Sequence, residues 1–161
     1  MSKAQTISTT ASDPTVAAAA AQFLSPVVLG LQALTINGKQ AHWHVRGANF
    51  IGVHELLDTI VAHAGDFADT AAERIVALGL PIDARVSAVA AKAPETGVPA
   101  GFAQSDEIIR TIVADIDAIL VDTKAAIEGL DEIDLTSQDV AIEIMRGLEK
   151  DRWFLVAHVA A

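Results

Sequence analysis

Apolar side chains recur at the three- and four-residue spacing of a helix along two long segments in the first half of the chain. Asp13 and Pro14 are typical of a helix start, with an N-cap residue followed by proline at the first helical position. Pro26 should kink or split this first helix, because proline cannot donate the helical hydrogen bond. At residues 46–49 a glycine suited to an unusual dihedral and an asparagine suited to capping predict a tight reversal, and a second helix should span about 50–78.

The second half of the chain repeats this pattern after a long connection, rich in proline and glycine, at residues 79–101. An Ala- and Val-rich stretch at 83–91 within it could form a short helix. Ser105, followed by two acids, should cap a third helix that ends near Gly129. Thr136, with an acid three residues later, resembles a capping box that opens a fourth helix. Two helical hairpins joined by a long crossover predict an all-α, ferritin-like four-helix bundle.

The composition favours one domain whose metal sites, if it has any, use nitrogen and oxygen ligands. With 161 residues and 52% hydrophobic content the chain can bury a sizeable core. We assign residues 13–161 to the bundle and residues 1–12, which have little to bury, to a flexible tail. The absence of cysteine excludes disulfides and thiolate metal sites.

Charge is distributed unevenly along the chain. Residues 16–36 carry none, but they are Ala-rich and follow no basic cluster, so we predict a helix buried in a protein assembly rather than a signal peptide or membrane span. We expect a cytoplasmic protein without a membrane partner. The net charge of −10, with only Lys3 as a basic residue before Lys39, opposes phosphate binding. DNA binding should therefore be weak or absent at neutral pH.

Four potential metal ligands share one face of the second predicted helix. His54 and Asp58 are four residues apart, as are Asp69 and Glu73, so each pair could bind one metal ion. At about 100° per residue, all four side chains fall within one stripe. Asp58 and Asp69 are separated by roughly 16 Å along the helix axis. One helix cannot bring both pairs to the same metal ion.

The residues between the two pairs indicate how this gap could close. Val61, Ala62 and Gly65 are small or apolar, and because glycine inside a helix costs about 1 kcal/mol relative to alanine, Gly65 indicates the close approach of another backbone. If two copies of the helix cross antiparallel on a two-fold axis near residues 63 and 64, the first pair of one copy meets the second pair of the other. The opposite face should pack inside the subunit's own bundle, and it consists of Val53, Leu57, Ile60, Ala64, Phe67, Ala71, Ile75 and Leu78.

His42 completes the predicted ligand set. It lies about as far before the predicted reversal as His54 lies after it, so the two imidazoles should face each other across the hairpin. The predicted site consists of His42, His54 and Asp58 of one subunit with Asp69 and Glu73 of the partner subunit. Two histidines and three carboxylates suit iron, zinc or manganese, and ligand type alone does not choose among them.

The residues around these ligands form a dense motif over residues 39–79. It reads Lys39-Gln40-Ala41-His42-Trp43-x-Val45-Arg46-Gly47-x-Asn49-Phe50-x-x-x-His54-Glu55-x-x-Asp58, followed by Asp69-x-x-x-Glu73-Arg74. This pattern resembles the signature of the Dps family, the DNA-binding proteins from starved cells. In that family the matching positions form a ferroxidase centre between subunits, and twelve subunits assemble into a hollow shell.

The resemblance implies a function. The chain would form a homododecamer built from two-fold dimers, bind two iron ions at each inter-subunit site, and oxidise ferrous iron with hydrogen peroxide or dioxygen. The ferric product would be stored in the cavity, which protects against oxidative damage. Trp43, next to His42, would by resemblance act as an electron sink, and packing is the alternative. Acidic residues near the turn between the last two helices would line iron-entry pores, and the candidates are Asp131, Asp134 and above all Asp139.

The remaining histidines receive no metal role. His44 lies about 200° around the helix from His42 and should be a surface or interface residue. His63 is off the ligand stripe and should border the bundle core or the two-fold axis. His158 should be a solvated side chain.

Three other functions remain open from the sequence. The first is a DNA-compacting nucleoid protein with secondary iron storage. In that case the chain would have to bind DNA without a basic tail. The second is a metal-dependent hydrolase of small amides or esters, in which paired metal ions activate water, although nothing in the sequence defines a substrate pocket. The third is a structural cage with inactive metal sites.

Overall fold

The computed structural model describes residues 13–92 and 95–160. The predicted tail at residues 1–12 lies outside the described residues, so the division into tail and bundle stays a prediction. In chain order the elements are α1 (Pro14–His44), β1 (Val45–Arg46), α2 (Phe50–Ala77), α3 (Val86–Lys92), β2 (Ala103–Gln104), α4 (Ser105–Leu130) and α5 (Leu135–Ala157). The predicted all-α architecture is confirmed, with four long helices and one short helix in the crossover.

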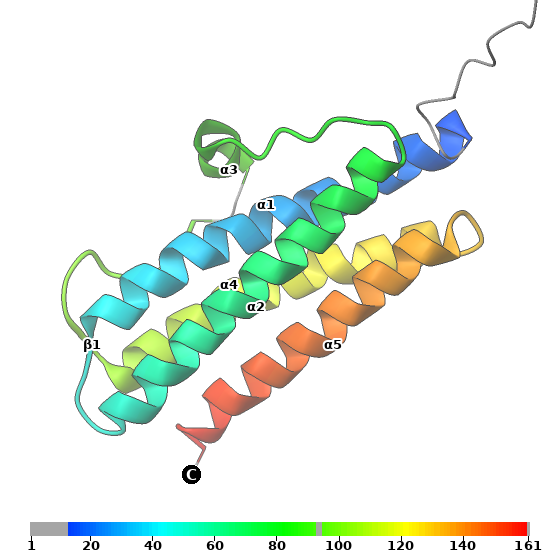
Figure 1. Cartoon of the computed structure of the whole chain (residues 1–161). Helices are drawn as coiled ribbons and strands as arrows, with labels where there is room; N and C mark the ends of the chain where they lie inside the picture. The colour runs from blue at the N-terminus through cyan, green and yellow to red at the C-terminus, as the bar shows by residue number, and fades with distance from the viewer. Residues whose placement is uncertain (1–12, 93–94, 161) are drawn as a thin grey trace, which may run out of the picture.

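Two helical hairpins, α1–α2 and α4–α5, pack together as a bundle (Figure 1). The crossover from α2 to α4 carries α3, which packs on α1. The crossover is tied to the first hairpin because β1 and β2 pair in parallel, with Val45 opposite Ala103. This small clasp lies at the end of the bundle where α1 turns into α2 and α4 begins.

The core lies between the four long helices and consists mainly of leucine and isoleucine. Its fully buried large side chains are Leu24, Leu31, Leu34, Leu57, Ile60, Ile75, Ile108, Ile109, Ile112, Ile116, Leu130 and Ile144. Two glycines allow aromatic rings to lie against a neighbouring helix. A Cβ atom at Gly129 would lie 2.3 Å from the ring of Phe23, and one at Gly147 would lie 2.2 Å from the ring of Phe67. Helices α1 and α4, and likewise α2 and α5, therefore pack closely at these points.

Helix α1 begins where the sequence predicts. Asp13 caps it by accepting a 2.7 Å hydrogen bond from the Thr15 amide, and Pro14 occupies the first turn. The prediction that Pro26 could split the helix is wrong, since α1 continues through it. The Pro26 side chain is exposed, so its ring is accommodated on the solvent side while the core residues on either side hold the helix in place.

Helix α1 is also the one helix among the described residues that is long and apolar enough to cross a membrane by length and composition alone. In this structure it packs against α2 and α4 and contributes leucine and valine side chains to the core. Within this copy 44% of its most apolar stretch is buried, and burial of the rest in a protein assembly stays a prediction.

The predicted starts of the last two helices need correction. The N-cap of α4 is Gln104, and Ser105 is already helical; its hydroxyl instead donates a 2.6 Å hydrogen bond to the Ala48 carbonyl. The N-cap of α5 is Asp134 rather than Thr136, and its carboxylate accepts from the Ser137 amide. At α5 a neighbouring polar side chain therefore caps the helix in place of Thr136, whereas at α4 the Gln104 side chain makes no cap hydrogen bond.

Candidate metal centre

The reversal between α1 and α2 places the first histidine pair. Gly47 has φ +95° and Asn49 has φ 58°, so both residues adopt left-handed backbone conformations, which glycine and asparagine tolerate best. A side chain at Gly47 would collide with Gln104, because a Cβ atom there would lie 2.2 Å from Gln104 Oε1. The expected capping role of the Asn49 side chain is wrong, since it makes no cap hydrogen bond.

His42 and His54 lie face to face across this hairpin. Their ring centroids are 3.6 Å apart and the ring planes differ by 22°. Each Nδ1 contacts the other residue's main-chain carbonyl, at 2.8 Å for His42 and 3.0 Å for His54. A carbonyl oxygen can only accept, so Nδ1 carries the proton in both rings. In the neutral form of each ring Nε2 then has the lone pair, and the rings are held in the way that metal-binding imidazoles usually are.

Asp58 joins the two histidines at the surface. Its Oδ1 lies 3.5 Å from Nδ1 of His42 and also pairs with the ammonium of Lys39. The hydrogen bond from Lys39 is the main cause that holds the pKa of Asp58 below its ordinary value, and the two histidines add to the effect. The carboxylate is thus ionised at neutral pH and available to a cation, which would have to compete with Lys39.

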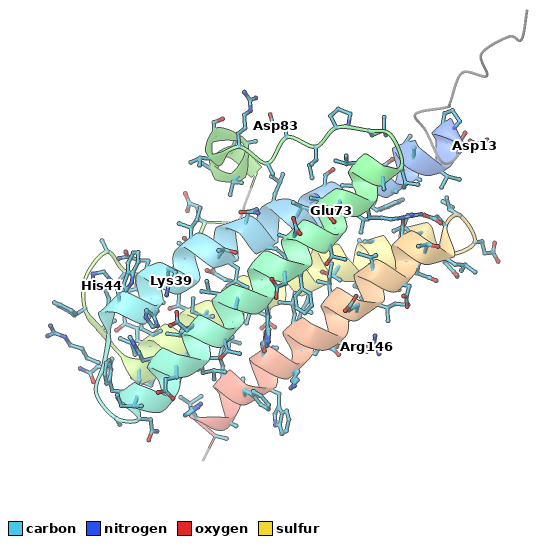
Figure 2. The ribbon with its side chains drawn as sticks, in the orientation of Figure 1. Asp13, Lys39, His44, Glu73, Asp83 and Arg146 are labelled. Carbon is cyan, nitrogen blue, oxygen red and sulfur yellow. The ribbon has the colours of Figure 1, made fainter. Side chains whose placement is uncertain are left out.

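Asp69 and Glu73 lie on the same helix but away from this cluster. α2 is continuous from Phe50 to Ala77, so the axial separation of roughly 16 Å expected between the two pairs applies. Within residues 13–92 and 95–160, no group of three or more His, Asp and Glu side chains surrounds a common point. Figure 2 shows Lys39 near the hairpin turn and Glu73 far along α2. A single copy of the chain therefore presents two incomplete halves.

The two faces of α2 differ as predicted. Every residue of the predicted core face is buried except Phe67, which is half-buried. On the ligand side, a Cβ atom at Gly65 would meet no atom within 4 Å, and Ala62 is exposed. Val61 is an exception, because it packs within the subunit against Gly38, where a Cβ atom would lie 2.7 Å from it. The surface around Ala62 and Gly65 is free within this copy, and its contact with another backbone stays a prediction.

The C-terminal half of α2 is anchored to the start of α5. Arg74, next to Glu73, donates from Nη2 to Asp134 at 2.7 Å and from Nε to the Ser137 hydroxyl at 2.9 Å. Burial works to raise the pKa of Asp134, but hydrogen bonds from Ser137 and Arg74 outweigh it and lower the pKa. Sequence reasoning missed this anchor and offered Asp134 only as a pore residue.

The other residues singled out by the resemblance lie near the surface. Asp131 accepts a 3.3 Å hydrogen bond from Gln138, and Asp139 is exposed. Trp43 is 63% exposed on α1. Nothing in one copy tests whether these side chains line a pore or take up electrons, and these roles stay predictions.

The histidines without a metal role have partners of their own. His44 contacts the Gln40 carbonyl at 2.8 Å through Nδ1, away from His42. His158 is half-buried and lines an apolar pocket with Leu56 and Trp153, so it is not the solvated side chain that the sequence predicted.

His63 makes a contact that sequence reasoning missed. Its Nδ1 lies 2.9 and 3.0 Å from the two carboxylate oxygens of Asp151 on α5, and Asp151 is only 1% exposed. A signal for this pair exists in the sequence. Asp151 falls at helical spacing between the core residues Leu148 and Leu155, where a charged residue needs a buried partner.

Comparisons with known proteins show the family to which the chain is similar. The family model described as a ferritin-like domain matches residues 30–161. Proteins called DNA protection during starvation protein are 34% identical, over 134 residues in Mycolicibacterium smegmatis and 127 in Agrobacterium fabrum. These alignments cover 75% and 78% of this chain, and 66% and 78% of the respective relatives, so the chain spans just under two thirds of the first.

A solved structure is more similar still. It is described as Dps from Microbacterium arborescens in the high iron form, and it is 71% identical with a TM-score of 0.93. The match covers 96% of this chain and all of that one.

Proposed function

The chain belongs to the ferritin-like family and, within it, to the Dps proteins, and from this premise we propose that it is a ferroxidase that oxidises and stores iron. Ferrous iron would bind at sites shared between two copies of the chain. The product would be kept inside a hollow homo-oligomer, for which we propose twelve copies.

The observation that carries this proposal is the geometry of the His42–His54 pair. Both Nδ1–H groups donate to carbonyls, which leaves both Nε2 atoms available as ligands, and the ionised Asp58 lies 3.5 Å from Nδ1 of His42. Brought around one ion, these two imidazoles and one carboxylate would form a ligand set for a divalent transition metal with open positions. The same set would also hold zinc or manganese.

A second copy would supply the missing carboxylates. Asp69 and Glu73 are exposed, lie on the stripe of His54 and Asp58, and are separated from them by the uncovered surface at Ala62 and Gly65. An antiparallel crossing of two α2 helices over that surface would bring Asp69 and Glu73 of one copy to the histidines of the other. Each two-fold contact would then complete two sites.

The reaction requires two ferrous ions for each peroxide. Each Fe²⁺ gives up one electron, and the two electrons with two protons convert hydrogen peroxide into two molecules of water. Hydrolysis of the two Fe³⁺ ions to ferric oxyhydroxide then releases protons to solvent. The carboxylates stabilise the higher charge of Fe³⁺, and the fixed imidazoles keep both ions at one place. Because peroxide is consumed together with iron, hydroxyl radical formation falls.

DNA compaction is not favoured for this chain. The relatives named for DNA protection carry that description for themselves, whereas this chain has a net charge of −10. Each copy added to an oligomer increases the repulsion of phosphate. We propose weak or absent DNA binding at neutral pH and a cytoplasmic location, where iron and peroxide meet.

The test is peroxide-dependent oxidation of ferrous iron, followed by sizing of the loaded particle. His54→Ala or Asp69→Ala should each slow oxidation at least about tenfold, whereas His44→Ala, in the same hairpin, should not. Cages reassembled from a mixture of the two slow variants should regain about a quarter of the wild-type rate, because a mixed dimer contains one intact site and one doubly defective site. No recovery in the mixture would refute shared sites.

A further inference from the structure

The His63–Asp151 pair joins the middle of α2 to α5. A carboxylate can only accept, so the His63 Nδ1–H donates to Asp151, and the two Nδ1–oxygen distances of 2.9 and 3.0 Å place the ring nitrogen between both oxygens. Asp151 is 1% exposed, whereas the His63 side chain is 40% exposed. The contact is therefore directional and shielded from water on the carboxylate side.

Stability alone is a poor reason for this pair. A buried carboxylate pays a desolvation penalty, and apolar residues of similar size at such positions are often as stable or more stable. Burial accordingly raises the pKa of Asp151, although His63 and the nearby Lys150 oppose the effect. The best-attested use of a buried ionic contact is to fix one packing arrangement among several.

His63 lies between the two ligand pairs along α2. His63 follows Asp58 by roughly 8 Å along the axis and precedes Asp69 by roughly 9 Å. It points about 140° away from Asp58 and about 120° away from Asp69, toward α5 rather than toward the ligand face. The contact therefore holds α2 on the side opposite its ligand face, midway between the two halves of the site.

The apolar contacts in the middle of α2 constrain its rotation less sharply than a directed hydrogen bond does. The core side of the helix includes the small side chains of Ala64, Ala68 and Ala71, and the tip of the Phe67 ring packs against Gly147. Such contacts are non-directional. A rotation of about 10° moves an atom roughly 6 Å from the helix axis by about 1 Å. Metal ligands tolerate only about 0.2 Å, and a misplacement of about 1 Å can cost about a hundredfold in rate.

We propose that His63, held by the buried carboxylate of Asp151, is a positioning residue for the iron site that fixes the rotation of α2 and with it the direction of both ligand pairs. This inference rests on the proposed ferroxidase function. His63 touches neither iron nor peroxide and acts only through the helix that carries His54, Asp58, Asp69 and Glu73.

The decisive variant replaces both partners with apolar residues, His63→Leu together with Asp151→Val. It leaves no unpaired charge, so the melting temperature should be close to that of the wild type. Oxidation of ferrous iron should nevertheless slow about tenfold, and the visible spectrum of bound Co²⁺ should change, since that spectrum reports ligand geometry. His63→Gln, whose amide can still donate to Asp151, should restore the rate to within about threefold of the wild type.

The control is Ile144→Val, which removes a buried methyl group from α5 without touching the pair and should lower the melting temperature but not the oxidation rate. A doubly apolar variant with the wild-type rate and Co²⁺ spectrum would overturn the inference. So would a His63→Gln variant as slow as the double variant. Failure of the proposed function itself would be recognised separately, because the wild type would then not oxidise iron or His54→Ala would have no effect.

Discussion

Asp134 is the residue whose replacement tests the anchor between α2 and α5 most directly. Asp134→Ala removes the helix cap at the Ser137 amide and the 2.7 Å ion pair with Arg74. Loss of an N-cap costs about 1 kcal/mol, and loss of a charged hydrogen bond between side chains that are only 14% and 22% exposed costs about 1 kcal/mol more. The resulting loss of about 2 kcal/mol corresponds to a fall in melting temperature of about 4–8 °C for a chain of this size.

The pH dependence of this loss follows from the pKa of Asp134. The pKa is lowered in the folded protein from an ordinary value of 3.8. A carboxyl group with a lowered folded pKa binds protons more weakly in the folded state than in the unfolded state. Its contribution is therefore complete above pH 3.8 and disappears as the pH falls through the lowered value. The difference between wild type and Asp134→Ala should be constant near neutral pH and shrink only in acid.

Thermal unfolding at one fixed chain concentration, followed by circular dichroism from pH 7 downward, measures this difference. The concentration is held constant because assembly couples to stability. Asp134→Asn should fall between wild type and Asp134→Ala, since its amide oxygen still caps the helix but carries no charge. Asp139→Ala, an exposed acid in the same helix, is the matched control. If Asp134→Ala and Asp139→Ala melt at the same temperature, the anchor contributes nothing and the reasoning fails.

Two further predictions concern a competitor for metal and a close packing contact. Lys39→Met should strengthen Zn²⁺ binding at the half-site several-fold in a calorimetric titration, because Lys39 no longer pairs with Asp58; unchanged affinity would show that the lysine is no competitor. Gly147→Ala should lower the free energy of unfolding by about 1–3 kcal/mol, because the added Cβ would lie 2.2 Å from the Phe67 ring. Urea titration measures this loss, and pairing Gly147→Ala with Phe67→Leu should recover part of it. A loss unaffected by Phe67→Leu would point to another cause.

The fold was largely predictable because helical periodicity is a local property with a strong signal. The second helix was expected at about 50–78 and is found at Phe50–Ala77. The start at Asp13 was correct, because a proline at the first helical position identifies the preceding residue as the cap. The starts of α4 and α5 were misplaced because several polar residues compete there, and tertiary contacts decide. The Ser105 hydroxyl donates to the Ala48 carbonyl, and the Asp134 carboxylate accepts from Arg74 as a second partner.

The candidate site was predictable to a different degree in its two halves. Counting residues on either side of the hairpin turn placed His42 opposite His54, which the structure brings together. Residue spacing could not predict the ion pair between Lys39 and Asp58, because the partner of a long flexible side chain depends on three-dimensional proximity. Asp151 was missed for a similar reason, since its partner lies on another helix far away in the sequence. The contact between copies concerns a second chain and was inferred from symmetry.

Because α2 is uninterrupted from Phe50 to Ala77, the number of complete metal sites depends on the number of chains in the assembly. One rigid rod carries two different and complementary ends, so on the proposed arrangement complete sites arise two at a time, and their number equals the number of chains. An assembly with an odd chain left over would display one vacant imidazole end and one vacant carboxylate end. The number of tightly bound metal ions per chain would therefore show whether the assembly contains an even or an odd number of chains.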